Sequence, residues 1–459
     1  MLFGFSFFPD FILLALGALV LLVFAFAALV FWMEKEARAF RVALLSALVG
    51  GSLLAVWPFL PGGTLLLYLK YVVLFLILGG TAVLFFPVRL LQQLRMDDPA
   101  VQLDERDVMF SRNELRRDSN RFEEYYRRHP EKREADERFR KNPGLLSEKA
   151  RYYLDSAFKV AESNFDVVER LNKEVVFPAQ QEPKVMDPAR TLYFLKQGGK
   201  RLGVHSLGVT ELKDYHLYSH RGRGAAYGEE VDNRHPRAIA FTVEMEEDFT
   251  RTAPGGPVII ESSQQYLRSG TIALQLAGWI SRMGYDARAH LDGNYELVCP
   301  LVARDAGLGE IGRMGLLMTP RLGPRVRIAV VTTNMPLPEN NYRPNRPVID
   351  FCRLCKKCAD VCPSASISKE DRKEIDGVLR WQIDSESCFT YWTLAGTDCG
   401  RCMAACPYSH PDNALHNFIR WGIQHFYFFR RFALKMDDFF YGRKPKSGKI
   451  PSWLYLSES

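Results

Sequence analysis

Three long apolar runs stand near the start of the chain. They are Phe11 to Trp32, Val42 to Leu60 and Leu65 to Val88, of 22, 19 and 24 residues, and Lys70 is their one charged residue. At ~1.5 Å rise per residue, each run can cross a hydrocarbon core of ~30 Å as a helix. Because the first ten residues hold no Lys or Arg and two further runs follow, a signal peptide does not explain the pattern. We expect a three-helix transmembrane anchor in residues 1–92.

The basic residues around these runs are distributed unevenly. Those next to the first loop or after the third run are Lys35, Arg38, Arg41, Arg89 and Arg95. The first ten residues and residues 58–64 contain none. Since loops rich in Lys and Arg stay in the cytoplasm, we expect a multi-pass protein of the cytoplasmic membrane. The N-terminus would lie outside, and everything after Val88 would face the cytoplasm.

Beyond the apolar runs the chain becomes strongly polar. Residues 93–153 mix both signs of charge, as in Arg133 to Lys141, which is typical of a solvated helix or a linker. The balanced signs argue against a nucleic-acid-binding arm, and the net charge of +7 suits an anionic inner leaflet. We therefore expect a charged juxtamembrane linker and no nucleic-acid partner.

Residues 154–340 alternate between strand and helix patterns. Arg237 to Glu244 and Val326 to Thr333 are predicted strands, the second rich in β-branched residues. Apolar residues between Ile272 and Met283 recur at helical spacing behind a start signal at Ser262 and Ser263. This alternation predicts an α/β (α+β) domain in which helices cover a sheet.

Eight cysteines form two runs in the last third of the chain. The runs are Cys352, Cys355, Cys358 and Cys362, then Cys388, Cys399, Cys402 and Cys406. The first run has the spacing of bacterial two-cluster ferredoxins, in which three thiolates hold one [4Fe-4S] cluster and the fourth reaches the other. We therefore expect Cys406 to complete the cluster of Cys352, Cys355 and Cys358. Cys362 would complete the cluster of Cys388, Cys399 and Cys402.

The alternatives for these cysteines are a structural zinc site and a disulfide framework. Zinc sites usually take two Cys-x2-Cys pairs, and disulfide frameworks belong to small secreted domains. Neither explains why both runs end in Cys-x3-Cys-Pro. Ten residues separate Cys388 from Cys399, where a plain ferredoxin has two, so Cys388 is the less regular ligand. We assign residues 341–411 to a ferredoxin-like module with two [4Fe-4S] clusters.

A dinucleotide-binding fingerprint also occurs in this chain. Gly307, Gly309 and Gly312 form a literal Gly-x-Gly-x-x-Gly, which should open a helix and be followed by an acid about 20 residues on. Pro320 interrupts the segment, and no acid stands near Thr332. The glycines indicate instead special backbone conformations or the close approach of a large group.

A set of motifs between about Leu207 and Leu454 resembles the corrinoid-dependent reductive dehalogenases. The motifs are Tyr218-Ser-His-Arg-Gly222, His235-Pro-Arg-Ala-Ile-Ala-Phe241, Tyr266 before a helix, Ala306 to Pro320, Gly323-Pro-Arg-Val-Arg327, both cysteine runs, and Phe439-Phe-Tyr-Gly-Arg443. The apolar runs with Glu34-Lys-Glu36 are similar to the small membrane anchor that accompanies these enzymes as a separate protein. No twin-arginine export signal is visible, which agrees with a cytoplasmic active site.

The resemblance implies a nitroreductase-like, corrinoid-binding fold with a base-off cobamide, fed with electrons by two [4Fe-4S] clusters. Reductive removal of halide from an organohalide needs two electrons and a proton. By similarity Tyr266 would donate the proton, Arg327 would stabilise the phenolate, and Asn294 would orient the phenol or the halide. The cofactor-binding residues would be Gly307, Gly309, Gly312, Arg313 and Gly315. Residues 412–459 would pack on the catalytic domain.

Two other functions stay open at this point. An epoxyqueuosine reductase shares the corrinoid and clusters but acts on transfer RNA, which calls for a basic tract and no membrane segments. A non-catalytic membrane ferredoxin would carry electrons and would contain iron without cobalt. A dehalogenase needs an electron donor, which could be a ferredoxin, a flavodoxin or a membrane reductase. The sequence does not define the oligomeric state.

Overall fold

The computed structural model describes residues 7–60, 63–88, 94, 97–99, 101–340 and 342–456. Arg89 and Arg95, used above for the topology, lie outside the described residues. The chain divides into two compact units: residues 1–93 with 412–445, and residues 94–411 with 446–459.

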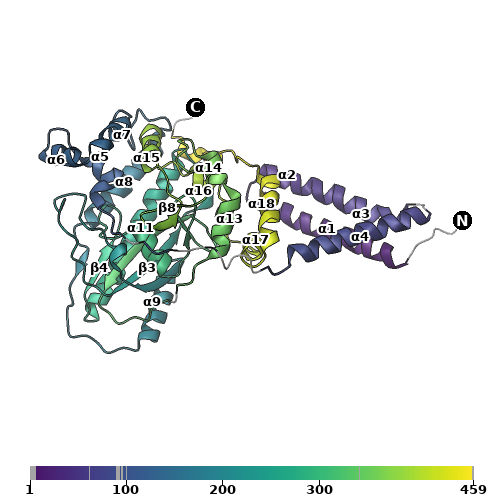
Figure 1. Cartoon of the computed structure of the whole chain (residues 1–459), viewed down its shortest axis with the longest axis horizontal. Helices are drawn as coiled ribbons and strands as arrows, with labels where there is room; N and C mark the ends of the chain where they lie inside the picture. The colour runs from purple at the N-terminus through teal and green to yellow at the C-terminus, as the bar shows by residue number, and fades with distance from the viewer. Residues whose placement is uncertain are drawn as a thin grey trace. The chain divides into compact units, whose positions relative to one another are not determined.

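The secondary structure of the first unit, in the residues that the structure describes, is helical (Figure 1). Its elements are α1 (Phe7–Met33), α2 (Ala37–Ser46), η1 (Ala47–Gly51), α3 (Ser52–Val56), η2 (Trp57–Phe59), α4 (Thr64–Leu84), α17 (Ala414–His425) and α18 (Tyr427–Tyr441). Three stretches are long and apolar enough to span a bilayer: Phe8–Met33, Ala37–Phe59 and Thr64–Leu84. They coincide with the three runs expected from the sequence.

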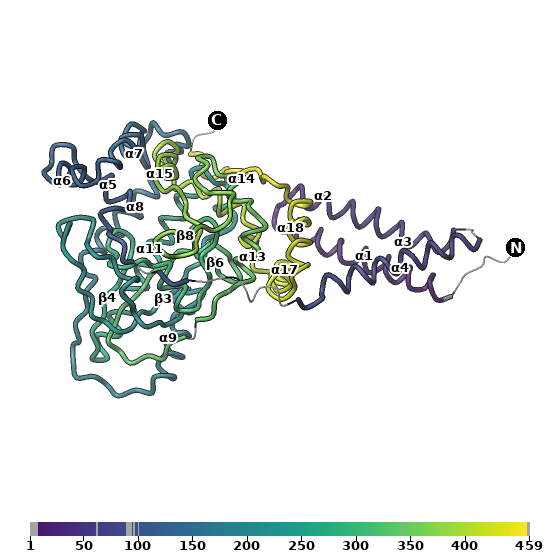
Figure 2. Tube along the Cα trace, viewed as in Figure 1, coloured from purple at the N-terminus to yellow at the C-terminus, as the bar shows by residue number. Residues whose placement is uncertain are grey.

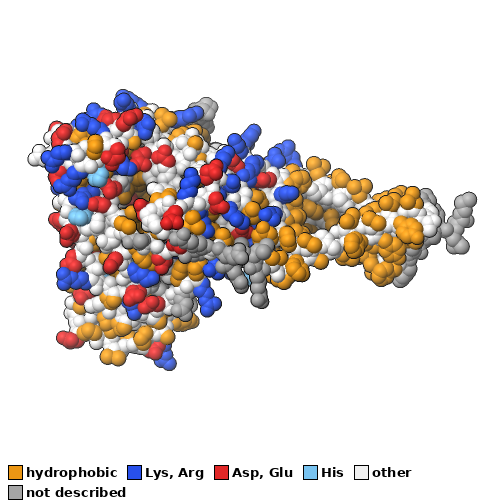
Figure 3. Space-filling view, viewed as in Figure 1, with side chains coloured by type: hydrophobic (Ala, Val, Ile, Leu, Met, Phe, Trp, Pro, Cys, Tyr) orange, Lys and Arg blue, Asp and Glu red, His pale blue; other side chains and the backbone are white. Residues whose placement is uncertain are grey.

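The surface of these helices is apolar. Figure 3 shows hydrophobic side chains along them, and Phe75 in α4 is 76% exposed. Inside the bundle the helices approach closely, since a Cβ atom added to Gly17 of α1 would lie 2.9 Å from the backbone nitrogen of Ala55 in α3. A continuous apolar exterior of this kind is unfavourable in water and favours membrane association.

Helices α17 and α18 belong to this first unit and residues 446–459 to the second, whereas the sequence analysis expected all of residues 412–459 to pack on the catalytic domain. The rings of Phe440 and Tyr441 lie 5.2 and 5.5 Å from that of Phe31 in α1. Glu34 accepts hydrogen bonds from Asn413 at 2.6 Å and His416 at 3.0 Å. The Glu-Lys-Glu loop thus binds the start of α17 rather than only water.

The second unit is built on an antiparallel sheet in the order β1-β4-β7-β3-β2. Its strands are β1 (Val176–Phe177), β2 (Ser206–Glu211), β3 (Arg237–Glu244), β4 (Ala287–His290) and β7 (Val326–Thr333). The two strands expected from the sequence have the predicted bounds. Successive residues of a strand face opposite sides. Accordingly Ile239 and Phe241 of β3 pack in one hydrophobic core, and Ala238 and Ala240 in another.

Helices cover both faces of the sheet (Figure 1). Helix α11 (Pro257–Arg282) packs on one face and carries α8 (Asp155–Leu171) on its outer side, while α12 (Cys299–Asp305) packs on the other. Helix α11 begins at Pro257, earlier than Ser262 and Ser263 suggested. Proline suits the first turn, which lacks backbone partners for its amide hydrogens.

The charged segment before the sheet is folded. It contains α5 (Met109–Glu114), α6 (Asn120–Arg128) and α7 (Pro130–Arg140), of which α5 and α7 pack on α15 (Ser385–Ala395) (Figure 2). Arg112 is 1% exposed and pairs with Asp136 at 3.3 Å and Glu386 at 2.9 Å. Opposite charges that look solvated in the sequence therefore include a buried ion pair.

Short elements complete the second unit. They are η4 (Glu105–Asp107), α9 (Pro188–Leu202), η5 (Asp214–His216), α10 (Glu247–Thr250), β5 (Glu310–Ile311), β6 (Leu317–Met318), α13 (Arg346–Cys355), α14 (Lys357–Val361), β8 (Lys373–Ile375), β9 (Val378–Arg380), α16 (Arg401–Ala404), η6 (Pro407–Ser409) and η7 (Ser452–Leu454).

The first unit contains a buried ion pair whose removal tests the helix packing. Lys70 of α4 donates to Asp10 of α1 at 2.7 Å, and both side chains are buried. Asp10→Ala leaves a buried charge uncompensated, so we expect a loss of ~3–5 kcal/mol. The double variant Asp10→Leu, Lys70→Leu should be close to wild type. Unfolding in mixed micelles measures the free energy of unfolding of both variants. Equal losses of stability in the single and the double variant would contradict a role for the ion pair in helix packing.

Candidate functional site

Tyr266 and Arg327 lie together between α11 and the sheet. The Cζ atom of Arg327, on β7, is 4.8 Å from the ring centroid of Tyr266, on α11. Burial raises the pKa of Tyr266 to about 12, and the charge of Arg327 works in the opposite direction. The phenol therefore keeps its proton near neutral pH and is placed where a cation favours its anion.

Two residues that the sequence analysis did not identify as site residues complete this site. The Nη2 atom of Arg327 donates to Ser262 Oγ at 2.6 Å and to Asp398 Oδ2 at 2.7 Å. Ser262 also donates to the same oxygen of Asp398. The sequence pattern places Ser262 at a helix start, whereas it lies inside α11. The one signal for Asp398 was its place directly before Cys399.

Buried polar atoms without a protein partner surround the same group. They are Nε of Arg327, Oδ1 of Asp398 and Oε1 of Gln265. Buried donors and acceptors are normally satisfied, and exceptions often mark a place where a ligand or water binds. These atoms are suited to hold polar groups of a bound molecule.

Asn294 is engaged elsewhere. Its Oδ1 accepts from Arg288 at 2.8 Å, and its Nδ2 donates to the carbonyl of Asn172 at 2.9 Å. Asp292, two residues earlier, raises the pKa of both Tyr266 and Arg327 by its charge. The loop of Asn294 therefore reaches the site electrostatically through Asp292.

The glycine-rich segment forms a β5–β6 hairpin rather than the start of a helix. A Cβ atom on Gly309 would lie 2.4 Å from the carbonyl oxygen of Met318, so a side chain there would clash with the facing strand. Gly312 and Gly315 line a cavity of about 400 Å³ together with the segment from Val378 to Ser385. This volume is in the range of small-molecule sites.

Arg313 lies with the cysteines, not with Tyr266. It is 1% exposed, donates to the carbonyl of Cys352 at 3.1 Å and to that of Ser368 at 2.7 Å, and stacks over Trp381. Burial lowers the pKa of Arg313, although the neighbouring thiols Cys352 and Cys358 favour its charge. Its hydrogen bonds tie the glycine-rich hairpin to the cysteine segment.

Four thiols line one small cavity, and we call them the first cysteine group: Cys352, Cys355, Cys358 and Cys406. Lys356 adopts a left-handed conformation with φ of 59° between α13 and α14, which reverses the chain between Cys355 and Cys358. Burial raises the pKa of the Cys358 thiol to about 12. Such thiols ionise only when a metal centre compensates their charge, so this donor set fits an iron–sulfur cluster.

The other four thiols form a second cysteine group: Cys362, Cys388, Cys399 and Cys402. The thiols of Cys362 and Cys388 raise the pKa of both Cys399 and Cys402, and burial is the larger cause. Cys388 reaches this group from α15, despite the long spacing to Cys399. That Cys406 lines the cavity of the first group is consistent with the crossed arrangement of ligands, which stays a prediction for all eight cysteines. Cys299 lies apart from both groups, in the hydrophobic core under α12.

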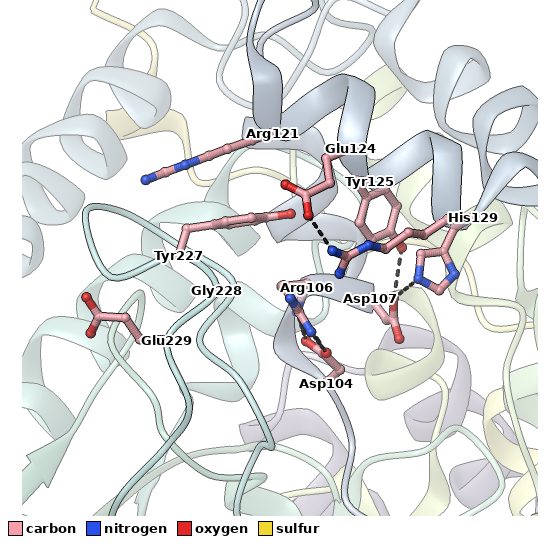
Figure 4. Close-up of a pocket in the computed structure, with 11 residues that line it drawn as sticks. Asp104, Arg106, Asp107, Arg121, Glu124, Tyr125, His129, Tyr227, Gly228 and Glu229 are labelled. Carbon is pink, nitrogen blue, oxygen red and sulfur yellow. Dashed lines mark hydrogen bonds and ion pairs between the residues drawn. The ribbon is translucent and has the colours of Figure 1, made fainter.

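A polar pocket of about 530 Å³ lies beside α6 (Figure 4). Its charges are largely paired within its own wall, as in Arg106 with Asp104 and Arg128 with Glu124. Figure 4 shows Arg121 extending past the ring of Tyr227. The pocket contains none of the residues of the Tyr266 site or of the two cysteine groups.

Comparison with known proteins adds evidence on the cysteine segment and the fold. A family model of the 4Fe-4S dicluster domain matches residues 351–410. The tetrachloroethene reductive dehalogenase of Sulfurospirillum multivorans is 34% identical over 219 residues, which are 45% of this chain and 42% of the relative. The enzyme of that name from Desulfitobacterium hafniense is 34% identical over 201 residues, 40% of this chain and 35% of the relative. Part of this chain is thus similar to reductive dehalogenases. It spans less than half the length of these two relatives.

The fold points to the same proteins. A solved catabolic reductive dehalogenase superposes with a TM-score of 0.60 at 22% identity, over 79% of this chain and 50% of that chain. The mixed α/β fold is therefore that of the solved dehalogenases. The epoxyqueuosine reductase of Bacillus anthracis is 31% identical over a shorter stretch of 98 residues, 21% of this chain and 22% of the relative.

Paired substitutions test the crossed grouping of cysteines. We expect about eight irons per chain, and about four after Cys352→Ser or Cys406→Ser. If these two residues bind one cluster, combining both changes should cost no further iron. Cys352→Ser with Cys362→Ser should instead remove nearly all iron. Iron analysis of anaerobically prepared protein distinguishes the outcomes, and nearly complete loss in the Cys352, Cys406 pair would refute the grouping.

Proposed function

We propose that this chain is a membrane-anchored reductive dehalogenase. It removes halide from an organohalide with two electrons and one proton, at a base-off cobamide supplied by two [4Fe-4S] clusters. The observation that carries the proposal is the partly buried Tyr266 phenol, which keeps its proton and lies against the guanidinium of Arg327. Two cysteine groups in the same unit support the electron supply.

The substrate class rests on the relatives. Two are named for tetrachloroethene, and a solved relative was crystallised with 3-bromo-4-hydroxybenzoic acid. Another solved structure is described as explaining B12-dependent dehalogenation. A cobamide would supply the cobalt at which the carbon–halogen bond is reduced. We propose that the glycine-rich hairpin contributes to its binding, although the 400 Å³ cavity onto which Gly312 and Gly315 open is smaller than a whole cobamide.

The protein contributes a proton in a site sheltered from water. A phenol is a poor acid unless its anion is stabilised, and Arg327 supplies a positive charge at the ring. When Tyr266 gives up its Oη proton, the guanidinium stabilises the phenolate that remains. Asp398 and Ser262 hold the guanidinium in place, so little reorganisation is needed at that moment.

We further propose that the second unit faces the cytoplasm. Lys35, Arg38 and Arg41 lie at one end of the candidate spans, and basic loops stay inside. A reducing compartment keeps the buried thiols available for clusters. The electron donor would then be a cytoplasmic ferredoxin or flavodoxin, or a membrane reductase.

Metal content and activity test the proposal directly. Anaerobically purified full-length protein should contain iron and cobalt at roughly eight to one. It should release halide from tetrachloroethene or 3-bromo-4-hydroxybenzoic acid when given a low-potential reductant. Iron without cobalt, and no uptake of added cobamide, would favour an electron carrier. Activity on epoxyqueuosine-containing transfer RNA alone would favour the other alternative.

Tyr266→Phe removes only the phenolic oxygen. We expect halide release to fall by about 10²–10⁴-fold while iron and cobalt remain bound, because general acid catalysis is lost. Tyr285→Phe is the matched control, since the Tyr285 hydroxyl donates to the carbonyl of Lys184 on an exposed loop. Retained turnover in Tyr266→Phe would remove this residue from the mechanism.

The pH dependence of halide release by Arg327→Gln tests the role of the Tyr266 proton. Loss of the cation raises the pKa of Tyr266 further above about 12, so the phenol stays protonated but becomes a weaker acid. The rate should therefore fall at all pH values below the phenol pKa, with no recovery on acidification. Steady-state rates between pH 6 and roughly pH 10 measure this. Recovery at low pH would mean that protonation of another group limits the variant.

A further inference from the structure

We infer that Asp398 is a positioning residue that couples the Tyr266 and Arg327 pair electrostatically to the cluster bound by the second cysteine group. The inference rests on the proposed function for the role of that pair. It extends the proposal because the carboxylate of Asp398 would act on both the pair and the cluster.

Asp398 is the anion of the site. Its Oδ2 accepts from Arg327 Nη2 at 2.7 Å and from Ser262 Oγ. The Arg327 and Asp398 side chains are only 13% and 11% exposed, and Ser262 is fully buried. A carboxylate with two donors and little contact with water has a well-defined position, and so does the guanidinium that it binds.

Asp398 is also part of the loop that carries a cluster cysteine. Cys399 follows it directly and adopts a left-handed conformation with φ of 59°. The buried Thr397 hydroxyl accepts the amide hydrogen of Cys399 at 3.2 Å and donates to the carbonyl of Pro254 at 2.9 Å. The loop is therefore held on both sides of Asp398, and Asp398 cannot move independently of Cys399.

Asp398 directly precedes Cys399, and its charge acts on the thiols of Cys388 and Cys399, whereas Arg327, its ion-pair partner, comes from β7. Reduction of a cluster adds a negative charge, which a nearby carboxylate opposes and a nearby cation favours. Removing the carboxylate should make the second cluster easier to reduce. Removing Arg327 leaves the carboxylate uncompensated and should make it harder to reduce. Simple damage to the loop would not give shifts of opposite sign.

Redox titration of the full-length, cluster-loaded protein tests this without substrate. We expect Asp398→Asn to shift the potential of the second cluster to more positive values, and Arg327→Gln to shift it to more negative values. Electron paramagnetic resonance follows both clusters, which are assigned with the cysteine variants described above. The first cluster is the internal control and should keep its potential. Asp292→Asn is the matched control, because Asp292 also acts on Arg327 but is not adjacent to a cysteine.

Kinetics give a second readout. Asp398→Asn should lower kcat by roughly 10–100-fold, as loss of an outer-shell partner does, with little change in KM. Asp398→Glu should restore part of the rate, since it returns the charge. A change confined to KM would contradict a positioning role.

The outcomes separate this inference from the proposed function. A wild-type protein that holds both clusters but does not dehalogenate would refute the function, while the two potential shifts would still test the coupling. Shifts of the same sign, no shift in either variant, or an equal shift in Asp292→Asn would overturn the inference. If Asp398→Asn loses its second cluster, Arg327→Gln decides, since Arg327 lies on β7 and not on the loop. A shift of the second cluster's potential to more negative values then supports the coupling. No shift, or a shift to more positive values, refutes it.

Discussion

The guanidinium of Arg327 is the charge around which the second unit is organised. A buried cation is unfavourable unless it is paired and hydrogen-bonded. Asp398 and Ser262 provide both, and the face of Tyr266 provides a third favourable contact. Because Arg327 comes from β7, Ser262 from α11 and Asp398 from the cysteine segment, one charge joins three parts of the fold. The candidate proton donor and the cluster loop are therefore parts of one electrostatic assembly.

The first unit is organised by apolar contacts with a few buried polar ones. Lys70 and Asp10 pair between α4 and α1, and the Glu34 loop binds α17. Arg38 donates to the carbonyl of Phe440 at 3.1 Å, which satisfies an acceptor near the end of α18. The chain leaves this unit after the third apolar run and returns to it at residue 412. Anchor helices and C-terminal helices thus form one body, although more than 300 residues separate them.

Sequence patterns predicted what depends on local spacing. The bounds of β3 and β7 and the three apolar helices follow from periodicity, and Cys406 lines the cavity of the first cysteine group, where the cysteine spacing places it. Features that depend on long-range charge pairing were not predictable. The segment around Arg112 looked like a solvated linker because its partner Glu386 lies far away in the sequence. Likewise, no sequence pattern predicts that the segment from residue 412 onwards contacts the Glu34 loop.

The same distinction applies within the candidate site. Tyr266 and Arg327 were found because motifs carry them, but motifs do not show which groups hold a side chain in position. Asn294 illustrates this, since its amide is used by Arg288 and Asn172 and the charge that reaches the pair is that of Asp292.

Asp398 is the converse case, because the sequence shows only that it precedes a cysteine and not that it binds Arg327. The buried thiols around Cys399 need a metal centre to ionise, because burial raises the Cys399 pKa to about 12. Whatever holds Cys399 in place also holds Asp398 against Arg327. The arrangement of the candidate proton donor therefore depends on the loop of Cys399, which is a physical reason for the two proposed functions to occur in one folded unit.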